Sequence, residues 1–361
     1  MKFVIAAGGT GGHLFPGLAV GEAMLARGHQ VMLLISEKEI DSLATRGRSE
    51  FRIERVPGVG LPKLLSPAVF SFLRRFRSGL KRCHELFSDF QPNAVLGMGG
   101  FTSTAPILAG RKRKAPTFVH ESNAIPGKAN RLNGRLVSCV LLGFEECRKY
   151  FPKAKCEVTG TPVRATLAEK LPKEKALAIF KLTPERRTLL VMGGSQGAHG
   201  LNQAVAAALP GLKDQVQVVH LSGSQDEQML RETYQRAGIP AFVAAFHHRM
   251  EEAYSAADLA IARSGAASLT ELSHFALPSI LSPYPFAAED HQTLNAQIFD
   301  RAGAGVLLPE RDATPEVLAA KLRWLLDDPA RLSEMSACSA KLAPHGAAER
   351  VAETILRHCS V

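Results

Sequence analysis

Residues 3–13, with the sequence FVIAAGGTGGH, decide the fold expected for this chain, because a short apolar strand runs directly into a glycine-rich turn. The same arrangement returns about half a chain later at residues 188–198, TLLVMGGSQGA. A helical pattern follows each turn, so each turn presents backbone N–H groups at a helix N-terminus. Glycine permits close approach and the helix dipole favours negative charge. Each turn is therefore predicted to hold an anion.

Apolar strand-like runs alternate with helical segments along the whole chain, which indicates an α/β fold with parallel sheets. We expect two Rossmann-like domains that face each other across a cleft. The expected strands are residues 3–7, 31–35, 52–56, 94–96, 117–119 and 139–142, and then 188–192, 217–221, 241–244, 259–262, 279–281 and 305–308. Pro162 excludes a helix at that point, so the domains are predicted at 1–161 and 162–343. A last helical segment at 344–361 is able to pack on the first domain.

The bulk composition is that of a soluble globular protein, with 361 residues, 46% of them hydrophobic and 22% charged. No run of apolar residues is long enough to span a membrane, and the N-terminal strand does not have the pattern of a signal peptide. The six cysteines have no metal-ligand spacing, so reduced thiols in a cytoplasmic protein are expected and structural zinc is not.

Two familiar nucleotide-binding motifs are alternative interpretations of the first glycine turn. A nicotinamide site fits poorly, because Leu14 stands where the third glycine of the dinucleotide pattern is required. The lysine of a P-loop is absent as well. There is no Asp-x-Asp motif to hold a metal on a diphosphate, so neither a cofactor nor an obligatory divalent ion is predicted. His13, at the end of the turn, either caps the helix or acts as a general base, with its pKa lowered by the neighbouring backbone dipoles.

Several further segments occur in order along the chain: GMGG at 97–100, HESN at 120–123, GTPVR at 160–164, RSGAASLTE at 263–271, PYP at 283–285 and DHQTLNA at 290–296. Together with the two turns, this series resembles the MurG family of bacterial transferases, which add N-acetylglucosamine to undecaprenyl-diphospho-N-acetylmuramoyl-pentapeptide. The resemblance implies a GT-B fold, UDP-N-acetylglucosamine as donor, lipid I as acceptor and lipid II, a precursor of peptidoglycan, as product. The implied reaction is an inverting transfer to the muramoyl 4-hydroxyl.

The resemblance also implies roles for individual residues. Glu271 would accept hydrogen bonds from the ribose hydroxyls of the donor. His13 is the first candidate base and Glu121 the second. Three glycines would hold the acceptor diphosphate, namely Gly9, Gly99 and Gly100. The full set of donor-binding positions is Thr10, Gly11, Gly12, Asn123, Arg164, Ser195, His247, Ala266, Ala267, Ser268, Leu269, Thr270, Glu271 and Gln292.

Three positions depart from the family pattern. Ser122 replaces a glutamine, Thr161 replaces an asparagine, and residues 246–250, FHHRM, replace a segment that is commonly acidic in its middle. Contact with the uracil there would be made largely by the backbone, so we expect His247 to substitute. These changes affect the fine geometry more than the reaction.

An apolar stripe at helical spacing lies beside a run of cations after Pro67. The stripe is Leu65, Val69, Phe72, Leu73, Phe76 and Leu80, and the cations include Arg74, Arg75 and Arg77. This pattern is typical of an interfacial helix that binds anionic lipid, although an ordinary core helix has the same stripe. With a lipid-linked acceptor, it predicts a peripheral protein on the cytoplasmic face of the inner membrane, with other cell-wall synthesis proteins as further partners.

Other functions remain open at this stage. A UDP-N-acetylglucosamine 2-epimerase shares the donor and the architecture, and another transferase of this fold acts on diacylglycerol lipid. Nucleic-acid binding through the basic blocks, such as residues 111–114, is not expected, because no aromatic residues are interleaved and no binding motif is present.

Overall fold

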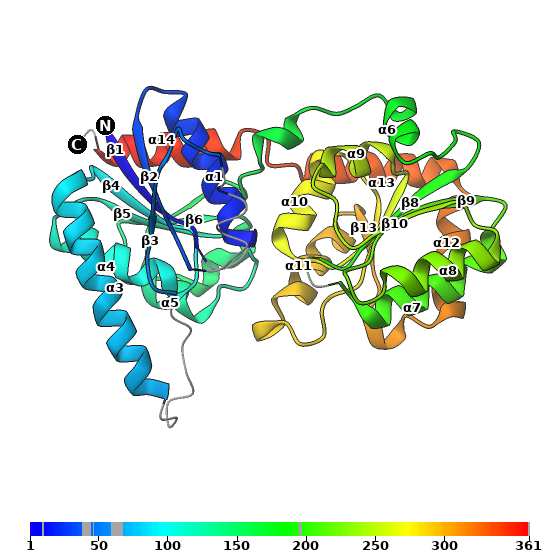
Figure 1. Ribbon diagram of the computed structural model, residues 1–361, viewed down its shortest axis with the longest axis horizontal. Coiled ribbons are helices and arrows are strands. Elements are labelled where there is room, and N and C mark those ends of the chain that lie inside the picture. The colour runs from blue at the N-terminus through cyan, green and yellow to red at the C-terminus, as the bar shows by residue number, and fades with distance from the viewer. Residues whose placement is uncertain (9–10, 38–44, 46, 59–67, 195–196, 360–361) are drawn as a thin grey trace. The chain divides into compact units, whose positions relative to one another are not determined.

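The computed structural model describes residues 1–361 except 9–10, 38–44, 46, 59–67, 195–196 and 360–361. The chain divides into two compact units: unit 1 comprises Met1–Arg164 together with Gly346–Val361, and unit 2 comprises Ala165–His345. Each unit is a parallel sheet with helices on both faces (Figure 1). The α/β class with two Rossmann-like domains is thus confirmed. Gly9, Thr10, Leu65 and Ser195 lie outside the described residues.

Unit 1 is built on a seven-stranded sheet. Its strands are β1 (Lys2–Ala6), β2 (Gln30–Ile35), β3 (Arg52–Arg55), β4 (Ala94–Gly97), β5 (Thr117–Glu121), β6 (Cys139–Leu142) and β7 (Cys156–Val158). They are ordered β3-β2-β1-β4-β5-β6-β7 and all neighbours run parallel. The helices are α1 (Gly11–Leu25), α3 (Ala68–Phe90), α4 (Thr104–Lys112), α5 (Lys128–Asn133) and α14 (Ala347–Cys359), with 3-10 segments η1 (Phe101–Ser103) and η2 (Glu145–Tyr150).

Strand β1 explains why both faces of this sheet are covered. Successive side chains of a strand point to opposite faces, and both sets are apolar here. Phe3 and Ile5 pack in one cluster with α1 and α14, whereas Val4 and Ala6 pack in another with α3 and α4. A run that is apolar throughout therefore becomes a central strand between two helical layers.

Helix α14 completes unit 1 although it comes from the other end of the sequence. Val351, Ala352 and Ile355 are buried in the same cluster as Phe3. At its start, the Arg350 guanidinium donates to the Thr159 carbonyl at 2.7 Å. One turn on, the hydroxyl of Thr354 donates to a Glu157 carboxylate oxygen at 3.0 Å. Apolar burial and these polar contacts together fix α14 on the first sheet (Figure 1).

Unit 2 repeats the plan with six strands: β8 (Arg187–Met192), β9 (Val216–Leu221), β10 (Ala241–Ala244), β11 (Leu259–Ala262), β12 (Ser279–Leu281) and β13 (Gly305–Leu307). Their order is β10-β9-β8-β11-β12-β13, again all parallel. The helices are α6 (Lys173–Ile179), α7 (His199–Ala208), α8 (Glu227–Ala237), α9 (Met250–Ala256), α10 (Ala266–His274), α11 (His291–Arg301), α12 (Pro315–Leu326) and α13 (Pro329–Lys341), with η3 (Ala165–Ala168), η4 (Leu209–Leu212), η5 (Ala288–Asp290) and η6 (Glu310–Asp312).

The strand order places the crevice of each unit. In an open parallel sheet, ligands bind beyond the carboxyl ends of the strands where the order reverses. The reversal lies between β1 and β4 in unit 1 and between β8 and β11 in unit 2. The first glycine turn follows β1 and the second follows β8. Both predicted anion sites therefore stand at topological switch points.

Two features differ from the expectation in detail. The edge strand β7 was not foreseen, because its three residues include Glu157 and carry no alternating pattern. The chain passes from unit 1 to unit 2 between Arg164 and Ala165, two residues beyond Pro162. Proline marks where a helix cannot continue, but the extent of a compact unit is set by packing, which places Arg164 in unit 1.

Candidate functional site

His13 lies in the first turn of α1 and packs on the loop that follows β4. A Cβ built on Gly99 would come within 2.9 Å of Cε1 and 3.0 Å of Nε2 of the His13 ring. Gly99 also has φ +121°, a conformation that L side chains rarely adopt. Only glycine therefore lets the imidazole lie against this loop. The structure thus brings together His13 and Gly99, which the sequence placed in two separate motifs.

Arg164 reaches the same helix from the far end of unit 1. Its guanidinium carbon lies 4.2 Å from the centre of the Phe15 ring, two residues after His13. A cation at this distance from an aromatic face is attracted by the ring quadrupole. Arg164 is thereby positioned beside the first turn, at the carboxyl edge of the sheet.

Glu121 ends β5 and is almost completely buried. Its Oε1 accepts hydrogen bonds from the backbone N–H of Asn123 at 2.9 Å and from the Asn123 side chain at 3.1 Å. Its Oε2 accepts from the Gly127 N–H at 3.1 Å and from Asn130 Nδ2 at 2.9 Å. Burial raises the pKa of Glu121, and these four donors oppose the shift by favouring the ionised form. The carboxylate is committed to holding the loop 122–127, which favours a positioning role over that of a base.

His120 is fully buried beside Glu121 on the same strand. Its Nε2–H donates to the Gly160 carbonyl at 3.0 Å, so its Nδ1 accepts from the Ser122 hydroxyl at 3.3 Å. Burial lowers the pKa of His120 to about 4, with a smaller lowering from the nearby His13 and against the hydrogen bond to Gly160, which raises it. The ring is therefore neutral in the folded protein near neutral pH.

This burial predicts a loss of stability in mild acid. The pKa of His120 is about 4 when folded and about 6.5 when unfolded, so the unfolded chain takes up the proton first. Its contribution to the free energy of unfolding, at most ~3 kcal/mol, is present above pH ~6.5 and lost as the pH falls towards 4. Denaturant unfolding of the wild type and of His120→Asn at pH 7 and pH 4.5 measures it. An equal pH dependence in the two proteins would contradict the assignment.

In unit 2, the segment 266–271 forms the first turns of α10. Leu269 is fully buried, and the Thr270 hydroxyl donates back to the Ala266 carbonyl at 2.8 Å. Ala267 and Ser268 are partly exposed. Any ligand at this helix N-terminus would therefore meet mainly backbone N–H groups and these small side chains. Gly11 and Gly12 occupy the corresponding place at the start of α1 in unit 1.

Glu271 is half-buried and contacts the neighbouring helix α9. Its Oε2 accepts a hydrogen bond from the Tyr254 hydroxyl at 2.6 Å. The sequence does not single out Tyr254, because a lone tyrosine in a short helix belongs to no motif. The contact is visible only once α9 and α10 are placed side by side.

His247 also turns towards α9. Its Nε2 lies 2.9 Å from the Glu252 carboxylate, whose other oxygen binds Arg249 at 2.8 Å. The His247 ring also packs edge-on against Phe180 at 5.3 Å. The side chain is thus fixed inside the unit, which leaves the backbone of this loop for contact with a ligand.

Gln292 braces the loop after β12. Its Oε1 accepts from the Tyr284 N–H at 2.9 Å, and its own carbonyl accepts from the Ser264 hydroxyl at 2.8 Å. Its Nε2 group makes no hydrogen bond with the described residues. This amide donor is the part of Gln292 suited to a sugar hydroxyl.

A hydrogen bond that the sequence did not suggest follows the second glycine turn. His199, the first residue of α7, has Nδ1 2.7 Å from a carboxylate oxygen of the buried Asp226. The other Asp226 oxygen accepts from Asn202 at 2.7 Å. Asp226 thereby ties the start of α7 to the loop after β9.

The apolar stripe of helix α3 is buried at one end and partly exposed at the other. Phe76 and Leu80 pack on the buried cluster of Cys83, Leu86, Phe87 and Phe90, so this half is core. Phe72 packs against Phe76 and Phe101. Towards the start of the helix, Phe70 is 83% exposed and Leu73 42%. Phe70, which lies outside the predicted stripe, is thus the most exposed apolar side chain of the described part of α3.

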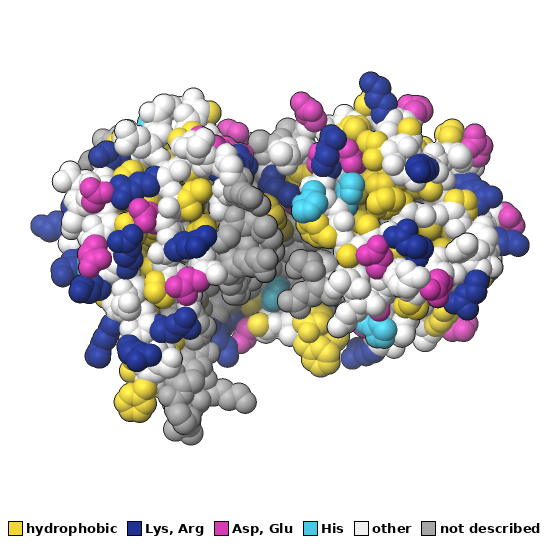
Figure 2. All heavy atoms as spheres, in the orientation of Figure 1, with side chains coloured by type: hydrophobic (Ala, Val, Ile, Leu, Met, Phe, Trp, Pro, Cys, Tyr) yellow, Lys and Arg dark blue, Asp and Glu magenta, His cyan; other side chains and the backbone are white. Residues whose placement is uncertain are grey.

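The cations of α3 lie on its exposed side. Arg74 and Arg77 make no ion pair with the described residues, and Arg75 pairs only with Glu37, at 3.6 Å. Figure 2 shows Lys and Arg side chains over the part of unit 1 that carries α3, with acidic side chains interspersed among them. No described helix is both long enough and apolar enough to cross a membrane.

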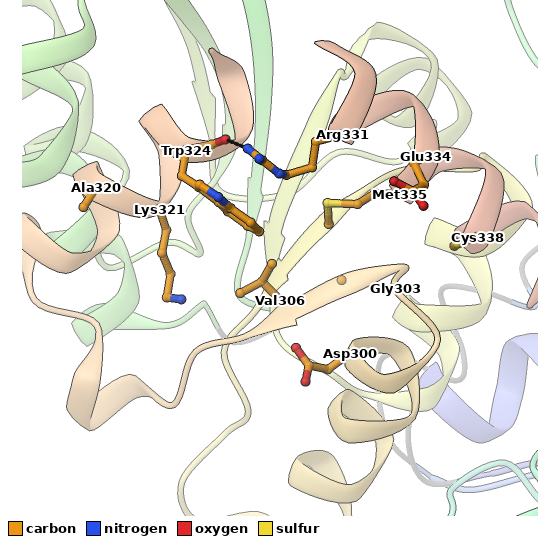
Figure 3. Close-up of a pocket in the computed structure, with 11 residues that line it drawn as sticks. Asp300, Gly303, Val306, Ala320, Lys321, Trp324, Arg331, Glu334, Met335 and Cys338 are labelled. Carbon is orange, nitrogen blue, oxygen red and sulfur yellow. Dashed lines mark hydrogen bonds between the residues drawn. The ribbon is translucent and has the colours of Figure 1, made fainter. Parts of the chain in front are cut away.

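A cavity of about 640 Å³ lies away from all these residues, on unit 2. It is bordered by β13, α12 and α13, and the Trp324 ring and the Arg331 guanidinium stack at 4.2 Å on one wall (Figure 3). None of the predicted site residues lines it. Within the described part of the chain, no group of three or more His, Cys, Asp or Glu side chains is placed to hold a metal ion.

Comparison with known proteins defines the class. Residues 3–142 match the N-terminal domain of glycosyltransferase family 28, and residues 188–351 match its C-terminal domain. The chain belongs to glycosyltransferase family 28.

Individual relatives cover the whole chain. It is 37% identical to the UDP-N-acetylglucosamine–N-acetylmuramyl-(pentapeptide) pyrophosphoryl-undecaprenol N-acetylglucosamine transferase of Geobacter sulfurreducens, over 99% of this chain and 98% of that protein. The transferase of the same name from Syntrophotalea carbinolica is 38% identical, with the same two coverages. Among solved structures, MurG of Acinetobacter baumannii is 28% identical, covers 99% of this chain and 100% of its own, and has a TM-score of 0.79.

Similarity to an epimerase extends to the fold alone. UDP-GlcNAc 2-epimerase from Neisseria meningitidis, bound to UDP-GlcNAc, has a TM-score of 0.72 over 99% of this chain, with 15% identity.

Proposed function

We propose that this chain transfers N-acetylglucosamine from UDP-N-acetylglucosamine to the muramoyl 4-hydroxyl of undecaprenyl-diphospho-N-acetylmuramoyl-pentapeptide (lipid I), forming lipid II for peptidoglycan synthesis. The observation that carries the proposal is the full-length likeness to transferases of that name, at 37% and 38% identity. The candidate residues support it, since most of them follow the carboxyl ends of strands, and the two glycine turns follow the central strands β1 and β8.

The units have different roles in this proposal. Unit 1 binds the acceptor, with its diphosphate on the first glycine turn and on Gly99 and Gly100. Unit 2 binds the donor, with its diphosphate on the second glycine turn, its ribose on Glu271 and its uracil on the backbone near His247. The resemblance to the family also assigns residues of unit 1 to donor binding, namely Thr10, Gly11, Gly12, Asn123 and Arg164.

The chemical step is one displacement at the anomeric carbon. The acceptor 4-hydroxyl attacks from the face opposite UDP, the bond from carbon to the UDP oxygen breaks, and the linkage inverts to β-1,4. His13 takes the hydroxyl proton on an imidazole nitrogen. Preorganised N–H groups stabilise the charge that develops on the departing UDP. Glu121 holds the loop 122–127 and with it Asn123, one of the proposed donor-binding residues.

A transfer assay tests the function. Labelled UDP-N-acetylglucosamine is incubated with the protein, with and without lipid I. Release of UDP that depends on lipid I, together with label in a lipid product, is expected. Acceptor-free formation of N-acetylmannosamine would instead identify an epimerase, and transfer to diacylglycerol would identify a different lipid transferase.

We further propose that α3 attaches the protein to the cytoplasmic face of the inner membrane, where the acceptor's polyprenyl tail lies. Its exposed Phe70 and Leu73 would enter the interface while the arginines contact anionic lipid. Each basic residue near an anionic surface contributes about 1 kcal/mol. The arrangement supports peripheral attachment through one helix that lies at the membrane surface, and not through a helix that crosses the membrane.

Charge reversal on α3 provides the test. Arg74→Glu/Arg75→Glu/Arg77→Glu is expected to weaken co-sedimentation with vesicles containing anionic phospholipid about a hundredfold or more. The matched control reverses three charges of the second basic block, Arg111→Glu/Lys112→Glu/Arg113→Glu, which should retain most of the binding. Equal loss in both proteins would indicate attraction by net charge alone and contradict a specific role for α3.

A further inference from the structure

Tyr254 is the buried side chain that holds Glu271. It is 2% exposed, and its hydroxyl donates to Glu271 Oε2 at 2.6 Å. Its ring packs against Phe275 with the centroids 5.1 Å apart, and Met192 Sδ lies 3.8 Å from the hydroxyl. Contacts from β8 and α10 thus fix the ring, so the position of its hydroxyl is set by the core of unit 2.

The fixed hydroxyl of Tyr254 restricts the flexible side chain of Glu271. A glutamate side chain has three rotatable bonds, and ordering them costs free energy when a ligand binds. A short hydrogen bond to one carboxylate oxygen removes that freedom in advance and is strengthened by the negative charge. The carboxylate therefore has a set orientation before any nucleotide arrives.

Helix α9 also fixes the loop that precedes it. Glu252, two residues before Tyr254, binds His247 at 2.9 Å and Arg249 at 2.8 Å and is itself almost completely buried. The seven residues of α9 thus anchor both the loop assigned to the uracil and the carboxylate assigned to the ribose.

We propose that Tyr254 is a positioning residue for the ribose of a uridine ribonucleotide: it presets Glu271 to accept hydrogen bonds from the vicinal hydroxyls. The inference rests on the proposed function, in which Glu271 binds the ribose of UDP. Tyr254 itself does not touch the nucleotide. Its removal should therefore reduce the discrimination between ribose and deoxyribose and leave the chemical step intact.

The experiment measures calorimetric affinities of the full chain for UDP and for 2′-deoxy-UDP. The variants are Tyr254→Phe, which keeps the ring, and the control Tyr234→Phe. Tyr234 is a suitable match because it is 1% exposed in the same unit and its hydroxyl makes one buried hydrogen bond, to His220 at 2.8 Å. Each variant loses one buried hydroxyl, and thermal unfolding verifies that the two costs are similar.

In the wild type, UDP should bind about tenfold or more tightly than 2′-deoxy-UDP, because the deoxy compound lacks one hydrogen bond to a carboxylate. Tyr234→Phe should retain this ratio. Tyr254→Phe should bind UDP about tenfold more weakly and reduce the ratio to about threefold or less, with KM for the donor raised and kcat unchanged.

The outcomes separate two failures. A wild type that discriminates and a Tyr254→Phe protein that discriminates equally would overturn the positioning role alone. A wild type with no affinity for UDP would overturn the proposed function and this inference with it. A ratio that falls equally in Tyr234→Phe and Tyr254→Phe would show a general effect of lost stability and would also overturn the role.

Discussion

His13→Ala is expected to lower the rate of transfer to lipid I about 10²- to 10⁴-fold at saturating donor, the usual contribution of a positioned general base. The imidazole lies against Gly99, at the carboxyl edge of the sheet where the acceptor diphosphate is proposed to bind. Its removal takes away the proton acceptor and leaves the donor site in unit 2 untouched. Steady-state rates and calorimetric affinity for UDP measure the two effects separately, and the affinity should not change.

The control for this variant is His29→Ala. His29 is an imidazole of the same unit but precedes β2 (Gln30–Ile35), at the opposite edge of the same sheet. Its loss should leave turnover near that of the wild type. If His13→Ala keeps near wild-type turnover, His13 is not the base.

Glu121→Ala should lower turnover together with the free energy of unfolding, because four hydrogen-bond donors lose their acceptor.

Glu271→Ala should weaken the binding of UDP on the order of 10²- to 10⁴-fold, because two charge-assisted hydrogen bonds to the ribose are lost, each worth roughly 1.5–3 kcal/mol. Uridine monophosphate should lose affinity by a similar factor, since the effect arises at the ribose and not at the diphosphate. Isothermal calorimetry on the full chain measures both affinities.

An exposed carboxylate of the same unit serves as the control. Glu232 lies on α8 and is exposed, so Glu232→Ala changes the net charge equally and should retain wild-type affinity. Unchanged affinity in Glu271→Ala would refute the ribose role. Equal losses in both variants would point to the charge of the unit and not to a contact.

The layout of both sheets follows from local sequence. Apolar runs such as Phe3–Ala6 are apolar on both faces, which only a covered parallel strand tolerates, and the glycine turns mark the switch points. Strand β7 escaped notice because an edge strand of three residues has too little periodicity to detect. The boundary of unit 1 at Arg164 could not be predicted either, since the contact of Arg164 with Phe15 joins residues far apart in the sequence.

The site shows the same limit. The motif glycines and Glu271 can be recognised because backbone geometry and ligand chemistry restrict those positions to one residue type. The partners of those residues cannot, because Tyr254 and Asp226 come close to the motifs only when separate elements pack together, and Glu252 contacts His247 only through the turn that leads into α9. The exposure of Phe70 could not be predicted for a related reason. Helical periodicity identifies an apolar stripe, but it does not show which turns of the helix pack on the rest of the unit.

The packing of α14 on the first sheet has a consequence for biosynthesis. Unit 2 is one continuous segment, so all of its core residues have been synthesised by the time His345 is added. The core of unit 1 includes Val351, Ala352 and Ile355, which are translated after all of unit 2. Domains generally fold as units during synthesis. Unit 1 therefore lacks one of its covering helices until α14 has been synthesised, so it cannot finish folding before the whole of unit 2 has been translated.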